Sequence, residues 1–262
     1  MQEITSSTNP RLKLARKLQR RRSREQAGLC LLEGLRLVAD AFGAGVDFDA
    51  VFVTPRLVDQ SDVASLLADM EKRGIPLFSV NESLLADLSD TVTPQGIVAI
   101  SHTPTLAVPA NASLLLVLDG VGDPGNAGTL LRSGAASGVD LVLFGPRSVD
   151  PFSPKVLRAG MGAHFRVPVR VCATWEVVAD YIGPGWRRYV ADAGGKTPYD
   201  GVDWRLPSAL IVGSEAHGPS DAANTDALAI GIPMQAATES LNAAVAGSVI
   251  LFEAARQRRT RL

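Results

Sequence analysis

The sequence predicts an α/β protein built from two units. Strand-like and helix-like runs alternate along most of the 262 residues, which is the pattern of α/β folds. Residues 114–118 are a wholly apolar run bounded by Asp119 and Gly120, as expected of a buried parallel strand. Residues 101–112 carry two prolines and no periodic pattern, which indicates a linker. We therefore predict a small α/β domain over residues 1–100 and a parallel-sheet domain over residues 113–262.

The first domain is expected to begin with a basic amphipathic helix over residues 10–24. Asn9 and Pro10 form a helix start, and a narrow apolar stripe follows. That stripe consists of Leu12, Leu14, Ala15 and Leu18. The alternation after this helix predicts strands at residues 29–32, 50–54, 76–80 and 96–100. It predicts helices at residues 34–44, 61–73 and 83–88.

The second domain continues the alternation after its first strand at residues 114–118. Further strands are expected at residues 141–144, 165–169, 188–192 and 209–212. Helices are expected at residues 126–137, 153–158 and 175–181, with a last helix from about residue 241. Apolar side chains recur at helical spacing in that last helix, which predicts that one of its faces is buried. They are Leu241, Val245, Val249, Phe252 and Ala255.

The composition excludes several classes of protein. With 46% hydrophobic and 20% charged residues, the chain is neither collagen-like nor mostly disordered. Cys30 and Cys172 stand alone, which argues against a disulfide framework and against a zinc site and favours a reducing cytoplasm. No metal-ligand cluster is expected. No apolar run approaches the roughly 18–20 residues of a membrane span, and the N-terminus lacks a signal-peptide pattern.

The charges are distributed unevenly. Residues 1–25 carry eight Lys and Arg against two Glu, and the last twelve residues carry four Arg against one Glu, so both ends are basic. The segment between them is acidic, because the whole chain has a net charge of −1. Basic ends on an acidic body suggest contact with a polyanion such as nucleic acid. The alternative is a solvated helix face.

A glycine motif after the strand at residues 114–118 admits two interpretations. Gly120-Val-Gly122-Asp-Pro-Gly125 matches the G-x-G-x-x-G pattern of dinucleotide-binding folds. However, Pro124 removes a backbone N–H from the loop that would hold a pyrophosphate. Asp140 has the separation of the usual ribose-binding acid but precedes its strand instead of following it. A nucleotide-cofactor oxidoreductase is therefore the less favoured interpretation.

Three polar and glycine-containing segments follow one another in the second domain. The first is Asn126-x-Gly128-x-x-x-Arg132, the second Gly213-Ser-Glu215-x-x-Gly218, and the third runs from Ile232-Pro-Met234 to Ser240-Leu-Asn242. In this order they resemble the motifs of the SpoU/TrmH family of RNA ribose 2′-O-methyltransferases, and the resemblance covers the whole second domain. The sequence departs from the family pattern at Ala216-His217 and at Ala243-Ala244.

The resemblance implies a fold, a cofactor and an assembly. It implies a SPOUT-type parallel sheet whose C-terminal segment forms a deep trefoil knot, and a homodimer with its active site at the subunit interface. It also implies S-adenosylmethionine as cofactor, bound by the loops of the knot. The residues that it places at the cofactor are Gly213, Ile232, Met234 and Leu241.

The family match singles out Arg132 as the principal residue of the reaction. A guanidinium suits phosphate and sugar oxygens, and it stays protonated in proteins, so we expect Arg132 to position the substrate and not to act as a base. The other predicted catalytic residues are Asn126, Glu215, Ser240 and Asn242. Asn126 and Ser240 can alternatively be helix caps, and Glu215 can alternatively form a loop salt bridge.

The first domain resembles the small substrate-binding domain that precedes the catalytic domain in many of these enzymes. Glu33-Gly34-x-Arg36 follows its first predicted strand. An N-terminal α/β domain of this size is more typical of ribosomal than of transfer RNA enzymes, so we favour 23S rRNA over tRNA as substrate, with an antibiotic-resistance role left open. A non-catalytic RNA-binding relative is a further alternative. The predicted RNA-binding residues are Arg11, Arg16, Arg20, Arg21, Arg22, Arg24 and Arg36.

Overall fold

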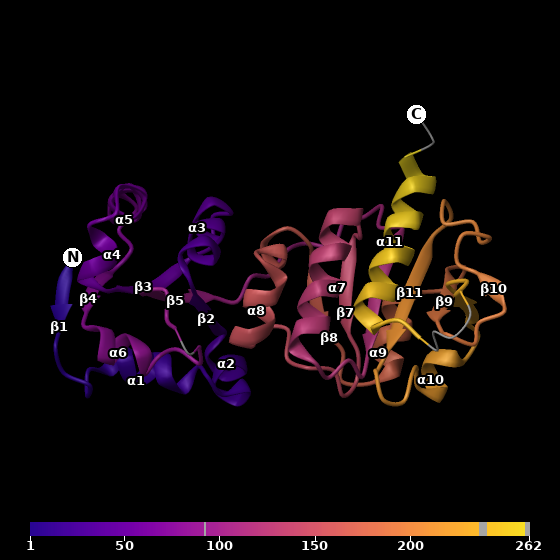
Figure 1. The fold of residues 1–262 in the computed structure, drawn as a ribbon, viewed down its shortest axis with the longest axis horizontal. Helices are drawn as coiled ribbons and strands as arrows, with labels where there is room; N and C mark the ends of the chain where they lie inside the picture. The colour runs from indigo at the N-terminus through magenta and orange to yellow at the C-terminus, as the bar shows by residue number, and fades with distance from the viewer. Residues whose placement is uncertain (92, 236–239, 260–262) are drawn as a thin grey trace. The chain divides into compact units, whose positions relative to one another are not determined.

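The computed structural model describes residues 1–91, 93–235 and 240–259, which form two compact units (Figure 1). The first unit comprises Met1–Pro104 together with Phe152–Phe165. The second comprises Thr105–Pro151 and Arg166–Leu262. Both units are α/β, and none of the described helices is long and apolar enough to span a membrane.

The first unit contains a five-stranded sheet in the order β1-β4-β3-β5-β2. Strands β1, β4 and β3 are parallel, and β5 runs antiparallel to both β3 and β2. The strands are β1 (Gln2–Ile4), β2 (Leu29–Glu33), β3 (Phe48–Val53), β4 (Leu77–Val80) and β5 (Ile97–His102). The helices are α1 (Pro10–Lys17), α2 (Arg21–Ala27), α3 (Leu35–Gly43), α4 (Pro55–Val58), α5 (Ser61–Lys72) and α6 (Glu82–Ala86).

Helices cover both faces of this sheet, because its strands alternate between two cores. In β5, Val98 and Ile100 face a core shared with α1 and α6, whereas Ile97 and Ala99 face a core shared with α3 and α5. Such alternation is the period-two pattern of a strand. The sheet is therefore buried on both sides.

The predicted basic helix over residues 10–24 is two helices. The chain becomes extended at Arg20 (φ −95°, ψ 132°), between α1 and α2. Arg24 lies in the second helix, where its buried guanidinium donates to the backbone oxygen of Leu18 at 2.7 Å. This interaction stabilises the end of α1, whose last carbonyl groups have no partner within the helix.

One segment of the first unit comes from a later part of the sequence than we predicted. Helix α8 (Pro154–Gly160) and the 3₁₀ turn η1 (Ala163–Phe165) place Leu157 and Phe165 in the core shared with α3 and α5. Arg158 pairs with buried Glu33 at 2.5 Å and with Asp90 at 2.6 Å. The expected strand at residues 165–169 is replaced by this turn and by a later strand.

The second unit contains a seven-stranded, wholly parallel sheet in the order β10-β12-β9-β11-β6-β7-β8. Its central strands β6 (Leu114–Asp119) and β11 (Ser208–Gly213) are buried throughout. The other strands are β7 (Leu141–Phe144), β8 (Val169–Val171), β9 (Arg187–Ala191), β10 (Thr197–Pro198) and β12 (Leu228–Gly231). We did not predict β1, β10, β12 or the short helices α4 and α10 (Asp221–Asn224).

Two pairs of helices cover the two faces of this sheet. Helices α9 (Trp175–Ile182) and α10 (Asp221–Asn224) contribute Val178, Ile182 and Ala223 to one core. Helices α7 (Pro124–Ser137) and α11 (Ala243–Arg259) lie side by side on the other face (Figure 1). They approach closely at Gly247, where a Cβ atom would lie 2.5 Å from Leu130 Cδ2.

The apolar stripe of the last helix is not buried within the chain. Val245, Val249 and Phe252 are 48%, 37% and 49% exposed, and Leu241 just before the helix is 37% exposed. The face of α11 that packs on the sheet and on α7 is instead made of residues at other positions of the helix. They are Ala244, Gly247, Ile250, Leu251 and Ala254. The expectation of a buried stripe is therefore wrong for the single chain.

Candidate active site

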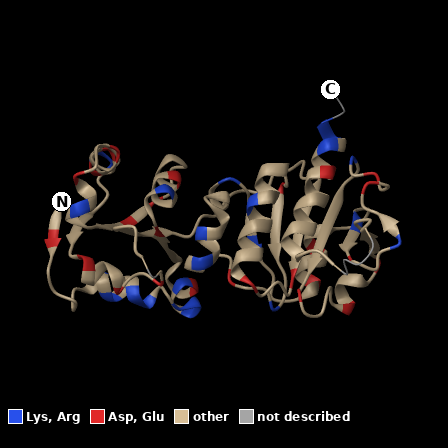
Figure 2. Cartoon of the chain, viewed as in Figure 1, with Lys and Arg blue, Asp and Glu red and all other residues tan. Residues whose placement is uncertain are grey.

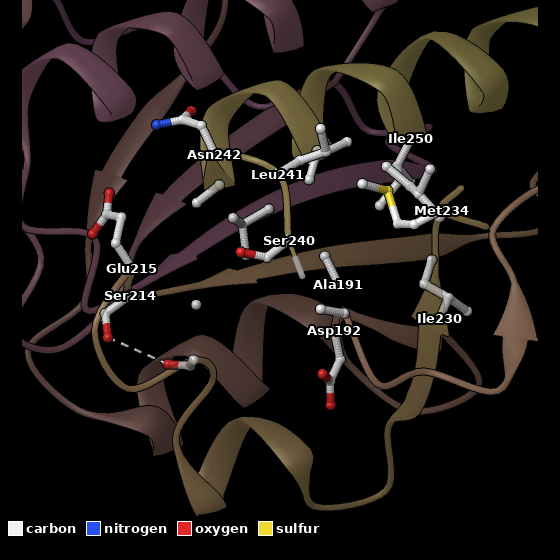
Figure 3. Close-up of a pocket in the computed structure, with 17 residues that line it drawn as sticks. Ala191, Asp192, Ser214, Glu215, Ile230, Met234, Ser240, Leu241, Asn242 and Ile250 are labelled. Carbon is white, nitrogen blue, oxygen red and sulfur yellow. Dashed lines mark hydrogen bonds between the residues drawn. The ribbon is translucent and has the colours of Figure 1, made fainter. Parts of the chain in front are cut away.

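A cavity of about 360 Å³ lies in the second unit, at the carboxyl ends of β9, β11 and β12 and beside the start of α11. This is the edge of a parallel sheet where ligands usually bind. Figure 3 shows the side chains around it. The lining residues are Ala191, Asp192, Ala193, Val212, Gly213, Ser214, Glu215, Gly218, Ile230, Ile232, Met234, Ser240, Leu241, Asn242, Ala243, Ala246 and Ile250.

One wall is formed by a tight loop after β11. Ser214 and Gly218 exchange backbone hydrogen bonds of 3.1 and 2.9 Å, and Gly218 has a φ of 66°. The loop returns so close to the strand that a Cβ atom on Gly213 would lie 2.2 Å from the backbone nitrogen of Pro219. Only glycine permits this approach.

A buried carboxylate holds the far end of this loop. Asp119, at the end of β6, accepts a hydrogen bond from the backbone N–H of Ser220 at 2.6 Å and from Trp175 Nε1 at 3.2 Å. Sequence reasoning used Asp119 only as the boundary of a strand. Its position at the carboxyl end of a buried parallel strand could have predicted that it lies near a functional site.

The opposite wall is apolar. Ile230, Ile232, Met234, Leu241 and Ile250 contribute to it, and Figure 3 shows Ile230, Met234 and Ile250 on the side of the cavity away from Glu215. An apolar wall with a few polar groups is typical of a cofactor site. All four residues predicted to contact a cofactor, Gly213, Ile232, Met234 and Leu241, therefore line one cavity.

A hydrogen-bonded chain of three side chains borders the polar side of the cavity. Asn242 Nδ2 donates to Asn126 Oδ1 at 3.0 Å, and Asn126 Nδ2 donates to Glu215 Oε1 at 2.5 Å. The three residues come from three separate parts of the sequence. The structure thus brings Asn126, Glu215 and Asn242 together, with Ser240 on the same cavity.

Neither Asn126 nor Ser240 is the N-terminal cap that the sequence allowed it to be. Asp123 Oδ1 accepts from the backbone N–H of Asn126 at 2.8 Å and caps α7, so Asn126 is not the cap. Asn242 Oδ1 accepts from the backbone N–H groups of Ala244 and Val245 at 2.9 and 3.2 Å. Asn242 therefore occupies the capping role that we had considered for Ser240.

Arg132 lies apart from the cavity. It is exposed on α7 and is not among the lining residues, and its side chain has no hydrogen bond or ion pair with any residue that the structure describes. Its guanidinium is therefore available to a ligand outside the cofactor cavity.

Other candidate reactive groups are absent from the cavity or inert. Burial raises the pKa of the Cys172 thiol above its usual range, which disfavours the reactive thiolate. Within the described ranges, no group of three His, Cys, Asp or Glu side chains is placed to hold a metal ion. Asp192, which sequence reasoning missed, lines the cavity and accepts from the backbone N–H of Gly194 at 2.9 Å.

The predicted RNA-binding arginines divide into two groups. Arg11 donates to the backbone oxygen of Asp49 at 3.0 Å and lies over the ring of Phe78, and Arg21 pairs with Glu25 at 2.7 Å. Arg16 donates to the backbone oxygen of Ser7 at 2.7 Å. Arg24 is buried, so it has a structural role and is removed from the set.

The second group is free for a ligand. Arg20, Arg22 and Arg36 are exposed and make no contact of this kind within the described parts of the chain. Figure 2 shows Lys and Arg residues gathered along α1 and α2. The positive charge of this surface therefore comes from fewer arginines than the sequence suggests.

Comparison with known proteins defines the class to which this fold and cavity belong. The profile of the SpoU rRNA Methylase family matches residues 113–252, and that of the MRM3-like substrate binding domain matches residues 9–99. The chain belongs to the SpoU rRNA methylase family.

Individual relatives agree with this assignment. The chain is 36% identical to rRNA methyltransferase 3, mitochondrial, of Mus musculus, over 91% of this chain and 70% of the relative. It is 32% identical to the 23S rRNA (guanosine(2553)-2′-O)-methyltransferase RlmP of Bacillus subtilis, over 96% and 98%. The crystal structure of an AdoMet-bound rRNA methyltransferase from Sinorhizobium meliloti superposes with a TM-score of 0.84 and 29% identity, covering 100% of this chain and 98% of that one.

Proposed function

We propose that this protein transfers a methyl group from S-adenosylmethionine to a ribose 2′-hydroxyl of ribosomal RNA. The observation that carries the proposal is that two distant motif segments line one cavity and that the third is hydrogen-bonded to both. Gly213 and Glu215 come from the second segment, and Met234, Leu241 and Asn242 from the third. Asn126 of the first segment is hydrogen-bonded to both.

The cavity suits the cofactor in chemistry. Its apolar wall of Ile230, Ile232, Met234 and Ile250 would hold the adenosyl group, and the backbone around Gly213 would approach it closely. S-adenosylmethionine supplies a methyl group on a positively charged sulfur. The chain's own contribution is to hold and orient the reactants, which can provide much of the rate enhancement of an in-line displacement.

Arg132 is proposed to bind the RNA beside the reacting ribose. A guanidinium can form two parallel hydrogen bonds to a phosphate, and this one is exposed with its donors unused within the described residues. Since an arginine does not give up its proton, its role is to position the substrate.

We propose 23S rRNA as the substrate, with tRNA as the alternative. The name of the Bacillus subtilis relative specifies a ribose of 23S rRNA, and the first unit matches a substrate-binding domain. We further propose that the enzyme works in the cytoplasm, where reducing conditions keep Cys30 and Cys172 as thiols.

The active enzyme is proposed to be a homodimer of knotted chains. Leu241, Val245, Val249 and Phe252 form an exposed apolar stripe, and such a stripe on a soluble protein is typical of a protein interface. A second copy of the chain would bury it. The trefoil knot is inferred from the family, and the packing of residues 240–242 beside the loop after β11 is compatible with it.

The exposed stripe yields a prediction about assembly. Replacing Val249 and Phe252 with aspartate is expected to convert the dimer to monomers, because two charges cannot be buried at the centre of an apolar interface. Light scattering coupled to gel filtration measures the mass. Val177→Asp on α9 is the control, since Val177 is 39% exposed on the opposite face of the sheet. A double variant that remains dimeric would place the interface elsewhere.

The surface of α1 and α2 yields a prediction about RNA binding. Replacing Arg20 and Arg22 with alanine should weaken RNA binding and lower the slope of log affinity against log salt by about 0.7–0.9 for each lost phosphate contact. Filter binding to a 23S rRNA transcript at several salt concentrations measures both quantities. The control removes two exposed lysines, Lys72 and Lys196, and should leave the slope unchanged. An unchanged slope in the arginine variant would identify this surface as a solvated face.

The function itself is tested by methyl transfer in vitro. Ribosomal RNA from cells that lack the protein should accept labelled methyl groups from S-adenosylmethionine, and the label should appear on a ribose. Calorimetry should detect binding of S-adenosylmethionine but not of NAD. Binding of NAD alone would support an oxidoreductase, and cofactor binding without transfer to any RNA would support a non-catalytic relative.

A further inference from the structure

The hydrogen bonds from Asn242 to Asn126 and from Asn126 to Glu215, beside the cavity, run in one defined direction. Asn242 Oδ1 accepts from two backbone N–H groups at the start of α11, so the Nδ2 group of Asn242 must be the donor to Asn126. Asn126 therefore receives this bond on Oδ1 and presents its own Nδ2 to Glu215. Exchanging the oxygen and nitrogen positions of either the Asn242 or the Asn126 amide would break hydrogen bonds, so the orientation of both amides is determined.

This direction fixes how the carboxyl group of Glu215 is held. Its Oε1 accepts the hydrogen bond from Asn126 Nδ2 at 2.5 Å. Its second oxygen, Oε2, accepts no hydrogen bond from the residues that the structure describes. Glu215 is thus an anchored carboxylate on the wall of the cofactor cavity with one oxygen available.

We propose that Glu215 is the group that accepts the proton from the ribose 2′-hydroxyl during methyl transfer. This inference rests on the proposed function. In the step, the hydroxyl oxygen forms a bond to the methyl carbon, the carbon–sulfur bond breaks with its electron pair passing to sulfur, and the hydroxyl proton passes to Oε2 of Glu215. The carboxylic acid then releases this proton to solvent, which restores the carboxylate.

The neighbouring groups are less suited to this task. Arg132 remains protonated and cannot accept a proton. Asp192 is the other carboxylate in the described lining, and it lies after β9. Glu215 lies on the same side of the cavity as Asn242 (Figure 3) and is hydrogen-bonded to Asn126. Ser240 carries a hydroxyl, which is a far weaker base than a carboxylate.

Two substitutions of Glu215 separate proton transfer from mere structural support. Glu215→Gln keeps the length and can still accept from Asn126, but it loses the basicity. Glu215→Asp keeps a carboxylate but shortens its reach. If Glu215 accepts the proton, kcat should fall by at least about 100-fold in the Gln variant. The Asp variant should be the more active of the two. Both variants should bind S-adenosylmethionine within a few fold of the unaltered protein by calorimetry.

The test uses the full-length protein, rRNA from cells that lack it, and Glu176→Gln as a control in the same unit. Glu176 is exposed on α9 and does not line the cavity, so this variant should retain full kcat. Near-normal kcat in Glu215→Gln would overturn the proposal, and so would an Asp variant less active than the Gln variant with intact cofactor binding. Absence of transfer by the unaltered protein on every RNA would instead overturn the proposed function.

Discussion

Replacing Gly213 with alanine is expected to weaken S-adenosylmethionine binding by about 10- to 100-fold. The added Cβ atom would lie 2.2 Å from Pro219 N and 2.3 Å from the carbonyl carbon of Gly218. These neighbours are backbone atoms in a loop that Asp119 holds through Ser220, so they cannot turn aside as a side chain could. An added methyl group in such a tightly packed place costs about 1–3 kcal/mol in strain or backbone shifts. If the loop after β11 moves to make room, the same free energy is lost from cofactor binding, which corresponds to the stated loss of affinity.

Calorimetry measures this affinity, and thermal unfolding shows whether the variant is folded. Gly43→Ala is the matched control, because a Cβ atom there meets no other atom within 4 Å. The control should bind the cofactor normally. If Gly213→Ala bound S-adenosylmethionine with unchanged affinity, the loop after β11 would not form a wall of the cofactor site.

Arg132→Ala is expected to lower kcat by about 100-fold or more while the affinity for S-adenosylmethionine stays within a few fold. In the proposed role Arg132 positions the substrate, so its loss would misplace the reacting hydroxyl, whereas Arg132 does not line the cofactor cavity. Single-turnover methylation of rRNA and calorimetry measure the two quantities.

A second substitution tests the geometry of the same side chain. Arg132→Lys retains the charge but loses the planar pair of donors, so it should also be poor. Near-normal turnover in either Arg132 variant would remove this residue from the site. A large loss of cofactor affinity would show instead that Arg132 acts through the cavity.

The α/β character of the fold could be predicted because apolar strands and periodic helices carry a local signal. Residues 114–118 and 141–144, for example, are strands of the parallel sheet within β6 and β7. Short edge elements such as β1 and β10 have three and two residues, too few to show a period. The break at Arg20 is accompanied by a hydrogen bond from Arg24 to the backbone oxygen of Leu18, and no periodicity reveals such a contact.

Two features depend on contacts between distant parts of the chain. The segment Phe152–Phe165 packs in the first unit through Leu157, Phe165 and the Arg158–Glu33 pair. A protein shortened to residues 112–262 would therefore expose these side chains. The stripe on α11 is apolar, as predicted, but Val245, Val249 and Phe252 are exposed in the single chain.

The candidate site could be predicted only in part. The family resemblance selected part of the cavity lining, including Gly213, Met234 and Leu241, because short motifs identify side chains that single-sequence periodicity cannot. It did not reveal the order of hydrogen bonds through Asn126 and Asn242, which are 116 residues apart. Nor did it separate buried Arg24 from exposed Arg20 and Arg22, since burial depends on the packing of α1 and α2.

The most direct test of the proposed function is a map of ribose methylation in all rRNA and tRNA from cells with and without this protein. We predict that one 2′-O-methyl group disappears from 23S rRNA in cells that lack it, and that it returns with the intact gene but not with the Arg132→Ala form. Identical maps in the two cells would contradict the account, and loss of a methyl group from a tRNA alone would contradict the choice of substrate.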